Sequence, residues 1–445
     1  MSTTPPAPAT PARPASGKPS AEALARLDRH WRLRYLLLAP HRLGFFLAMV
    51  VLVAASLWWA LVQVDQTSGV LGLSPALAPS LVHAVVMVFG FMPLFFAGFM
   101  FTACPKWLQV APLPAKSLLA PLLLQALGWL VWLVGAQHHA ALALALAGAS
   151  VAALGLAWTA ALFWGLVRQS HADDQLHARA VGLACMAASA ALAGTVLALA
   201  WQVPLLARAC TLSGLWGGVV VVFVAVAHRM VPFFTSDVVP LVQVWRPFWV
   251  LGLMLAVAVF EAAAVWVDLA GPPQGGAALA WGLLRGAVEL SAGAVLLWLA
   301  GVWRVLQKPK SRLLVMLHLG FAWLGVAVAL GGATQLLALL RGAPALPLAT
   351  LHALAMGCLA SLMLAMVTRV SCGYAGRAQV ADRTAWTLFW LLQAATVVRL
   401  LATWPSALSQ GLLLLAALLW AGLMAVWGVR LGAWYGRVRA DGRPG

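Results

Sequence analysis

Four histidines lie inside or at the ends of segments that are otherwise almost free of ionisable groups, namely His83, His228, His318 and His352. An imidazole surrounded by hydrocarbon needs a partner, because no water is present there to solvate it. The common uses of such a group are metal ligation and proton transfer. The alternative for each lone histidine is a hydrogen-bonded packing residue. We favour metal ligation at two centres.

His83 and His352 share a local pattern. His83 begins the sequence His-Ala-Val-Val-Met and His352 begins His-Ala-Leu-Ala-Met, each about four residues inside the outer end of an apolar segment. A rise of about 1.5 Å per residue puts both imidazoles at a matching depth of roughly 5–8 Å. The i, i+4 spacing places Met87 and Met356 one turn below them. The pattern predicts a pair of ligands that meet near the outer face.

Two glycines follow these motifs, Gly90 and Gly357. A residue without a side chain allows another group to approach the helix backbone closely. We therefore expect small surfaces there at which a flat macrocycle approaches the two helices.

A second set of candidates gathers near the opposite face. His228 lies late in one apolar segment, His318 lies about one and a half turns into another, and Cys104 and Cys372 end two further segments at a similar depth. Nitrogen and sulfur ligands together suit copper, particularly Cu(I). The alternatives are a helix-end histidine at the headgroups and two small buried hydrophobes. Sequence spacing leaves open whether these four residues are close in space.

The composition requires that these residues sit in membrane helices. The 445 residues are 63% hydrophobic and 9% charged, and the mean hydropathy is +0.94, which no soluble globule of this length shows. We therefore predict an all-α polytopic membrane protein. Twelve apolar runs are long enough to cross a bilayer core of about 30 Å. They lie near 43–64, 80–103, 117–136, 140–167, 178–200, 208–230, 246–269, 277–304, 312–341, 348–371, 383–403 and 406–430.

The formal charge of +17 indicates topology, not nucleic-acid binding. Basic residues precede the first run, follow the last and flank alternate connections, as the positive-inside rule requires. Both termini should therefore be cytoplasmic. Residues 1–42 are expected to be a disordered Pro- and Ala-rich segment that turns basic, 43–430 the membrane domain, and 431–445 a short basic tail. No cleavable signal peptide is expected, because the first apolar run begins far into the chain.

The five cysteines are scattered, which argues against structural disulfides, and the sequence has no Cys-x-x-Cys-His attachment site for a covalent haem. Four blocks, 83–107, 228–235, 318–323 and 352–377, resemble the signature segments of the NnrS family. The resemblance implies a twelve-helix protein of the bacterial inner membrane that contains haem, of b type, and copper. It also implies a role in denitrification and in resistance to nitric oxide and nitrosative stress.

The chain departs from the family pattern at several positions. Val85 and Val86 stand where many members have His and Glu, and Tyr374 stands where many have His. His228 precedes Arg229 where other members often have Gly, which predicts a modified inner site. Arg369 lies deeper than the other basic residues of its block, so it is the better candidate to hold a haem propionate or to structure that site. None of these departures affects the outer pair, His83 and His352.

Two other classes of function stay open. A secondary transporter would use buried His and Glu residues to carry protons or an ion, and Glu261 and Glu289 are the acids well inside apolar segments. A third possibility is an assembly factor without a metal. The expected partners are the lipid bilayer and nitric oxide or a related small molecule, with an unknown electron donor. No enzyme class follows from the residues.

Overall fold

Twelve helical segments in the computed structural model are long and apolar enough to cross a membrane, which confirms the predicted number and the all-α class. The structure describes residues 30–236, 247–271, 274–307, 311–342, 346 and 348–441, so most of the predicted N-terminal segment lies outside the described residues. The spans are Pro40–Ser68, Pro79–Leu108, Ala115–Gly135, Leu142–Gln169, Leu176–Ala200, Pro204–Phe234, Phe248–Leu269, Gly276–Trp303, Arg312–Arg341, Ala349–Tyr374, Arg383–Leu401 and Ser409–Tyr435.

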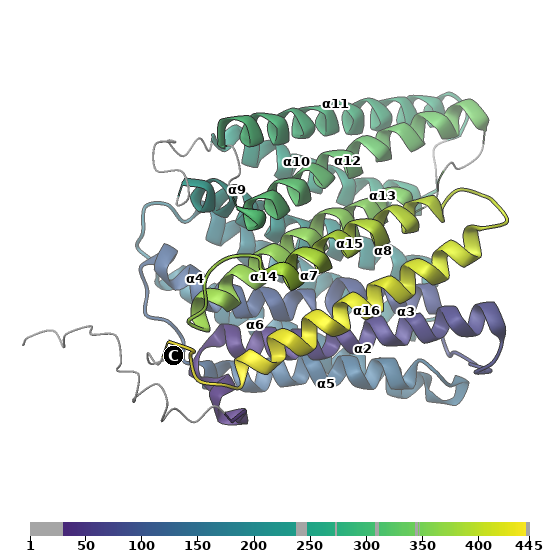
Figure 1. The fold of residues 1–445 in the computed structure, drawn as a ribbon. Helices are drawn as coiled ribbons and strands as arrows, with labels where there is room; N and C mark the ends of the chain where they lie inside the picture. The colour runs from purple at the N-terminus through teal and green to yellow at the C-terminus, as the bar shows by residue number, and fades with distance from the viewer. Residues whose placement is uncertain are drawn as a thin grey trace, which may run out of the picture.

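The helices run side by side along one axis (Figure 1). Proline in the first turn of α2, α3, α4 and α8 marks four of the helix starts, where its missing N–H costs nothing. The helices of the first six spans are α2 (Pro40–Ser68), α3 (Pro79–Phe89), α4 (Met92–Leu108), α5 (Leu119–Gly135), α6 (Leu142–Gln169), α7 (Leu176–Ala200), α8 (Pro204–Gly214) and α9 (Val221–Ser236). Those of the last six are α10 (Phe248–Leu269), α11 (Gly276–Gln307), α12 (Arg312–Arg341), α13 (Ala349–His352), α14 (Ser361–Tyr374), α15 (Arg383–Leu401) and α16 (Ser409–Tyr435).

Three of the four spans that carry candidate histidines are irregular. The second span changes from α3 to α4 at Gly90 and Phe91. The sixth contains a π-helical segment, η4 (Leu215–Val220), and the tenth contains another, η5 (Ala353–Ala360), directly after His352. A π-helical turn has i→i+5 hydrogen bonds in place of the i→i+4 bonds of an α-helix, and such turns occur frequently at functional sites. The irregular spans are therefore the ones expected to hold a site.

Small residues allow the first spans to pack closely. A Cβ atom added to Gly44 of α2 would lie 2.7 Å from the Cα atom of Gly98 of α4, and one added to Gly128 of α5 would lie 2.5 Å from the carbonyl oxygen of Gly148 of α6. Contacts of this kind take the place of hydrophobic burial between helices that share a lipid environment. They fix α4, which continues from His83, against α2.

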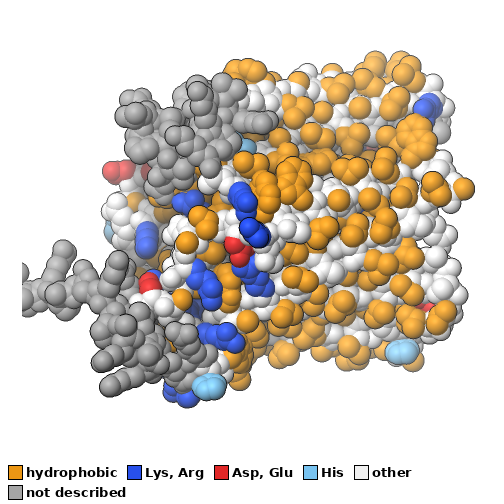
Figure 2. Space-filling view, viewed as in Figure 1, with side chains coloured by type: hydrophobic (Ala, Val, Ile, Leu, Met, Phe, Trp, Pro, Cys, Tyr) orange, Lys and Arg blue, Asp and Glu red, His pale blue; other side chains and the backbone are white. Residues whose placement is uncertain are grey.

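Both ends of the described chain lie at the same end of the bundle. The N–H of Arg32 donates to the carbonyl oxygen of Gly436, 2.8 Å away, and the Arg42 guanidinium donates to the carbonyl oxygens of Tyr435 and Arg437. On the face drawn in Figure 2, most Lys and Arg side chains gather at this end, and the coloured side chains elsewhere are mostly hydrophobic. By the positive-inside rule we expect this end to be the cytoplasmic one, and it is called so below.

Candidate metal centres

His83 lies one turn into α3, at the depth predicted from sequence. Its ring stacks on Trp59 of α2 with the centroids 4.1 Å apart and the planes 23° from parallel. The Nδ1 atom is buried and has no hydrogen-bond partner among the described residues. A buried nitrogen without a partner is costly, so it marks a place where a bound group would complete the structure.

His352 ends α13, three residues after Ala349, so its depth matches that of His83. Its Nδ1 atom lies 2.9 Å from the carbonyl oxygen of Leu348. A carbonyl can only accept, so Nδ1 carries the proton and Nε2 has the lone pair. A backbone hydrogen bond of this kind fixes the tautomer and the ring orientation of histidines that ligate metals.

Arg399 lies near both of these histidines. His83 is within electrostatic range of His352, and both are within range of Arg399 of α15. Helix α15 packs against both α13 and η5, which puts Arg399 beside the pair from a third span. Sequence reasoning missed Arg399, although an arginine two residues before the outer end of a span could have been noticed.

The residues expected to flank the outer pair are only partly as predicted. Met87 is half-buried and Met356 is buried, one turn below their histidines. A Cβ atom added to Gly357 would lie 2.5 Å from the Trp323 ring, and one added to Gly90 would lie 3.2 Å from a methyl group of Val51. The protein's own side chains fill both glycine surfaces, so the expectation that a macrocycle approaches there is wrong.

At the cytoplasmic side, His228 of α9 is fully buried and contacts a histidine that sequence reasoning missed. Its Nδ1 atom lies 3.0 Å from Nε2 of His177 in α7, and its Nε2 atom lies 3.1 Å from the carbonyl oxygen of Pro247. Because that carbonyl accepts, Nε2 of His228 donates to it, and a neutral His228 accepts from His177 at Nδ1. Both ring nitrogens of His228 are therefore engaged.

The histidine pair continues toward the cytoplasmic surface. The Nδ1 atom of His177 lies 4.0 Å from a carboxylate oxygen of Asp174, which also forms an ion pair of 3.1 Å with Arg229. The Arg229 guanidinium in turn lies over the Trp107 ring, 4.8 Å from its centroid. The sequence signal for His177 was weak, since it lies at the second position of a span next to polar residues.

The other predicted inner ligands lie in different surroundings. The Nδ1 atom of His318 lies 2.7 Å from the carbonyl oxygen of Leu314 on its own helix. Cys104 lies in the neighbourhood of Cys185 and Arg229, whereas Cys372 lies in that of Asp382, Arg377 and Arg430. Within the described residues, no three or more His, Cys, Asp or Glu side chains are placed to hold a metal ion.

Two further aromatic contacts lie near the cytoplasmic end. The Arg369 guanidinium lies over the Phe234 ring, 4.0 Å from its centroid, so Arg369 links α14 to α9. His41 of α2 is 1% exposed and lies against Tyr374, with the ring centroids 4.2 Å apart. The Nδ1 atom of His41 has no hydrogen-bond partner among the described residues. Sequence reasoning did not single out His41.

A cavity of about 50 Å³ lies among these helices in the cytoplasmic half of the bundle. Its lining is entirely apolar and comes from four spans, with Phe45 of α2, Phe95 of α4, Phe223 of α9 and Met363 of α14 among the contributors. A cavity without polar groups tends to stay dry and to accept small apolar molecules. Its size suits a molecule of very few atoms.

A family model described as NnrS protein matches residues 35–439, which cover all twelve spans. No curated protein matches the chain. The matched range includes the four histidine blocks, and it begins and ends close to the limits of the described chain.

Proposed function

The chain belongs to the NnrS family, and from this premise we propose that it is a haem- and copper-binding protein of the bacterial inner membrane that acts in the response to nitric oxide. Family membership supports a metal- or haem-associated role, and the twelve spans support a multi-pass membrane location. The observation that carries the proposal is that His83 and His352 lie at one depth, each about one turn from the start of its span, and that the buried Nδ1 atom of His83 has no partner in the described chain.

His83 and His352 are the residues that would hold a b-type haem. The buried Nδ1 atom of His83 has no partner in the described chain, and His352 directs its proton to Leu348 and keeps a lone pair at Nε2. A haem held there would supply one-electron chemistry.

Arg399 is suited to an anionic part of the same group. It is only partly exposed, lies within electrostatic range of both imidazoles, and forms no ion pair with an acid among the residues placed by the structure. A guanidinium binds carboxylates in a bidentate manner, so a haem propionate would complete its hydrogen bonds. Arg369, which the sequence suggested for a propionate, lies 17 residues after His352, about 25 Å further along the tenth span, and contacts Phe234. It therefore does not reach a haem held by the outer pair, and its role at the inner site stays a prediction.

Copper is proposed from family membership, and its ligands stay a prediction. His228, His318, Cys104 and Cys372 are not gathered into a donor group in the described chain, and both ring nitrogens of His228 already have partners. These four residues therefore do not fit a copper ion in the described chain, and we assign no part of the chemistry to copper.

Nitric oxide is small and uncharged, and the apolar cavity between α2, α4, α9 and α14 suits a molecule of that kind. Phe95 lies 12 residues after His83, so the cavity is about 18 Å further along the second span than the outer pair. A ligand held there would lie between the outer histidines and the cytoplasmic ones.

The decisive test is a reduced-minus-oxidised optical spectrum of the detergent-purified protein, with metal analysis of the same sample. We expect a b-type haem spectrum and copper in the wild type, and loss of most haem in both His83→Ala and His352→Ala. His138→Ala is the matched control, because His138 is exposed at the outer side. His318→Ala should retain haem, because His318 lies near the cytoplasmic start of α12 and its Nδ1 atom is hydrogen-bonded to Leu314 of the same helix.

Equal haem retention in His83→Ala, His352→Ala and His138→Ala would exclude the assignment of the axial ligands. A colourless and metal-free wild type, purified under conditions that retain haem in a known haem protein, would favour the secondary transporter instead. Copurification of a metal-free chain with a respiratory complex would favour an assembly factor.

A further inference from the structure

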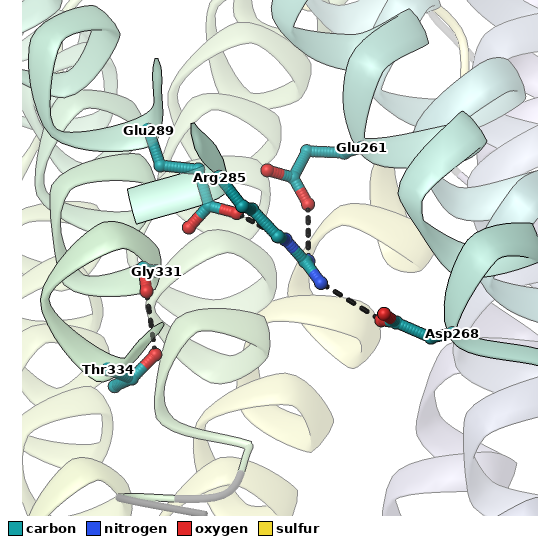
Figure 3. Close-up of polar contacts among 6 residues, drawn as sticks. All are labelled: Glu261, Asp268, Arg285, Glu289, Gly331 and Thr334. Carbon is teal, nitrogen blue, oxygen red and sulfur yellow. Dashed lines mark hydrogen bonds and ion pairs between the residues drawn. The ribbon is translucent and has the colours of Figure 1, made fainter. Parts of the chain in front are cut away.

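Arg285 of α11 connects three carboxylates within the membrane domain (Figure 3). Its Nε atom lies 2.6 Å from Glu289, one turn along the same helix. One terminal nitrogen lies 3.0 Å from Glu261 and the other lies 2.9 Å from Asp268, both on α10. All three nitrogens of one guanidinium are therefore engaged by different acids.

The cluster extends from the outer surface toward the middle of the bilayer. The Asp268 side chain is 51% exposed at the outer end of α10. Glu261 lies eight residues before the end of that helix, about 12 Å deeper, and its side chain is 7% exposed. Glu289 lies 13 residues into α11, about 20 Å from its start, with a side chain 3% exposed. Only Asp268 is well solvated.

The two glutamates lie close to each other because both bind the same guanidinium. Arg285 lies 3.0 Å from Glu261 and 2.6 Å from Glu289. Two buried carboxylates held this close repel each other, and a proton on one of them removes the repulsion and lets that group donate a hydrogen bond to the other. The geometry therefore favours one bound proton for the two glutamates.

A third helix closes the site. The Oε2 atom of Glu289 faces α12 where Gly331 has no side chain, and a Cβ atom there would lie 2.4 Å from that oxygen. The methyl group of Thr350 would lie 3.4 Å from the same added Cβ atom. The Thr334 hydroxyl donates to the carbonyl oxygen of Gly331, so it does not neutralise the acid. Gly331 thus makes room for the Glu289 carboxyl, and the neighbours named on this side, Thr334 and Thr350, carry no positive charge.

The buried charges do not balance if both glutamates are ionised. The groups that act electrostatically on Glu289 are Glu261 and Arg285, and those that act on Arg285 are the three carboxyls. The described parts of the helices that pack on α10 and α11 carry further titratable residues, none of which forms an ion pair with Glu261, Glu289 or Arg285. They are Arg208, Cys210, His228, Arg229, Arg312, His318 and Arg341. One guanidinium thus faces two buried carboxyls.

We propose that Glu261 and Glu289 share one exchangeable proton, which makes this pair a proton-binding site that Arg285 and Asp268 connect to the outer face. Binding converts one carboxylate and one proton into a carboxylic acid, and the buried charge then becomes neutral against Arg285. The site lies in spans seven and eight, apart from the histidines proposed as haem ligands, so it does not depend on the haem assignment.

Infrared spectroscopy of the purified, cofactor-containing protein at neutral pH tests the proposal, because a protonated carboxyl has a carbonyl stretch separate from that of a carboxylate. We expect a band equivalent to one protonated carboxyl per chain, which shifts when H₂O is replaced by D₂O. Glu261→Gln and Glu289→Gln should each remove it, since the remaining acid would pair one-to-one with Arg285. Asp268→Asn is the control and should retain the band.

Absence of the band in the wild type, or its presence in both glutamine variants, would overturn the proposal. Loss in only one variant would show that a single acid holds the proton and would overturn the sharing. Gln has the same shape as Glu, and a symmetric size-exclusion peak shows that each variant is folded. The double variant Arg285→Gln, Glu261→Gln should regain the band, because Glu289 would then have no cation.

Discussion

The Nε2 atom of His177 lies 3.0 Å from the Nδ1 atom of His228, so a histidine at the start of the fifth span is hydrogen-bonded to one near the end of the sixth. Both residues are almost fully buried. Since the second ring nitrogen of His228 faces the Pro247 carbonyl, this contact fixes the tautomer of His228 and ties together three segments at the cytoplasmic side.

We expect this pair to stabilise the bundle. His228→Ala and His177→Ala should each lower the free energy of unfolding by about 1–3 kcal/mol, because a buried partner is left without its hydrogen bond. The double variant should cost less than the sum of the single ones by about 1 kcal/mol. Unfolding in detergent measures this, with the exposed His171→Ala as control. Strictly additive losses would show that the two rings do not interact.

Arg399→Gln should weaken haem binding. A hydrogen bond to a charged group contributes about 1.5–3 kcal/mol, so affinity should fall roughly tenfold or more. The variant should also lower the midpoint potential, because a positive charge near the haem favours the reduced form. Spectroscopic haem titration and redox titration measure both effects. Arg341→Gln is a matched control, since Arg341 ends α12 and lies over Trp404. Equal affinity and potential in Arg399→Gln and the wild type would remove Arg399 from the haem site.

Gly44→Ala should destabilise the packing of α2 on α4. The new methyl group would lie 2.7 Å from backbone atoms of Gly98, which cannot move aside as a side chain does. Overpacking of this kind costs typically about 1–3 kcal/mol. Gly165→Ala in α6 is the control, because nothing lies within 4 Å of its added Cβ atom; it should gain roughly 0.5–1 kcal/mol. A higher melting temperature for Gly44→Ala than for Gly165→Ala would contradict the close approach of α2 and α4.

Asp382 should make the stability of the cytoplasmic side depend on pH. Its carboxylate accepts hydrogen bonds from Arg430 of α16 and from the N–H of Ala385, where it caps α15. The Arg430 hydrogen bond is the main cause that lowers the pKa of Asp382. A group with a lowered pKa stabilises the folded state above its ordinary value of about 3.9 and loses that contribution as pH falls through the lowered one.

Asp382→Asn should therefore cost about 0.5–1 kcal/mol at neutral pH, since Asn still caps the helix but no longer pairs with Arg430. The difference from wild type should shrink as the pH falls below the ordinary pKa of aspartate. Melting temperatures at several pH values measure it, with the exposed Asp173→Asn as control. A difference that does not change with pH would show that the ion pair contributes nothing.

The twelve spans could be predicted because a bilayer demands long apolar helices, and hydropathy alone detects them. The matched depth of His83 and His352 followed from counting residues along those helices. The helix change at Gly90 and the π-helical segments could not be predicted, because they depend on packing between spans. The expectation that a macrocycle approaches at Gly90 and Gly357 failed because Val51 and Trp323 fill those spaces. Both side chains come from distant parts of the sequence.

The polar contacts show the same division. The spacing of Arg285 and Glu289 is visible in the sequence as an i, i+4 pair, but the sequence does not reveal that Glu261 comes to the same guanidinium from another helix. In the sequence His177 stands next to a polar connection, and only the packing of α7 on α9 shows that it contacts His228. Local spacing therefore identified candidate residues, and only the fold identified their partners.

The contact of α16 with α2, with Arg32 hydrogen-bonded to Gly436, has a consequence for the order of the spans along the chain. The first and last described segments lie at neighbouring points, so the path of the described chain around the bundle is nearly a loop. A circular permutant, joined by a short linker between these points and opened in the cytoplasmic connection at 170–175, would keep every span in its orientation. The spans would then enter the membrane in a new order and still reach the same bundle.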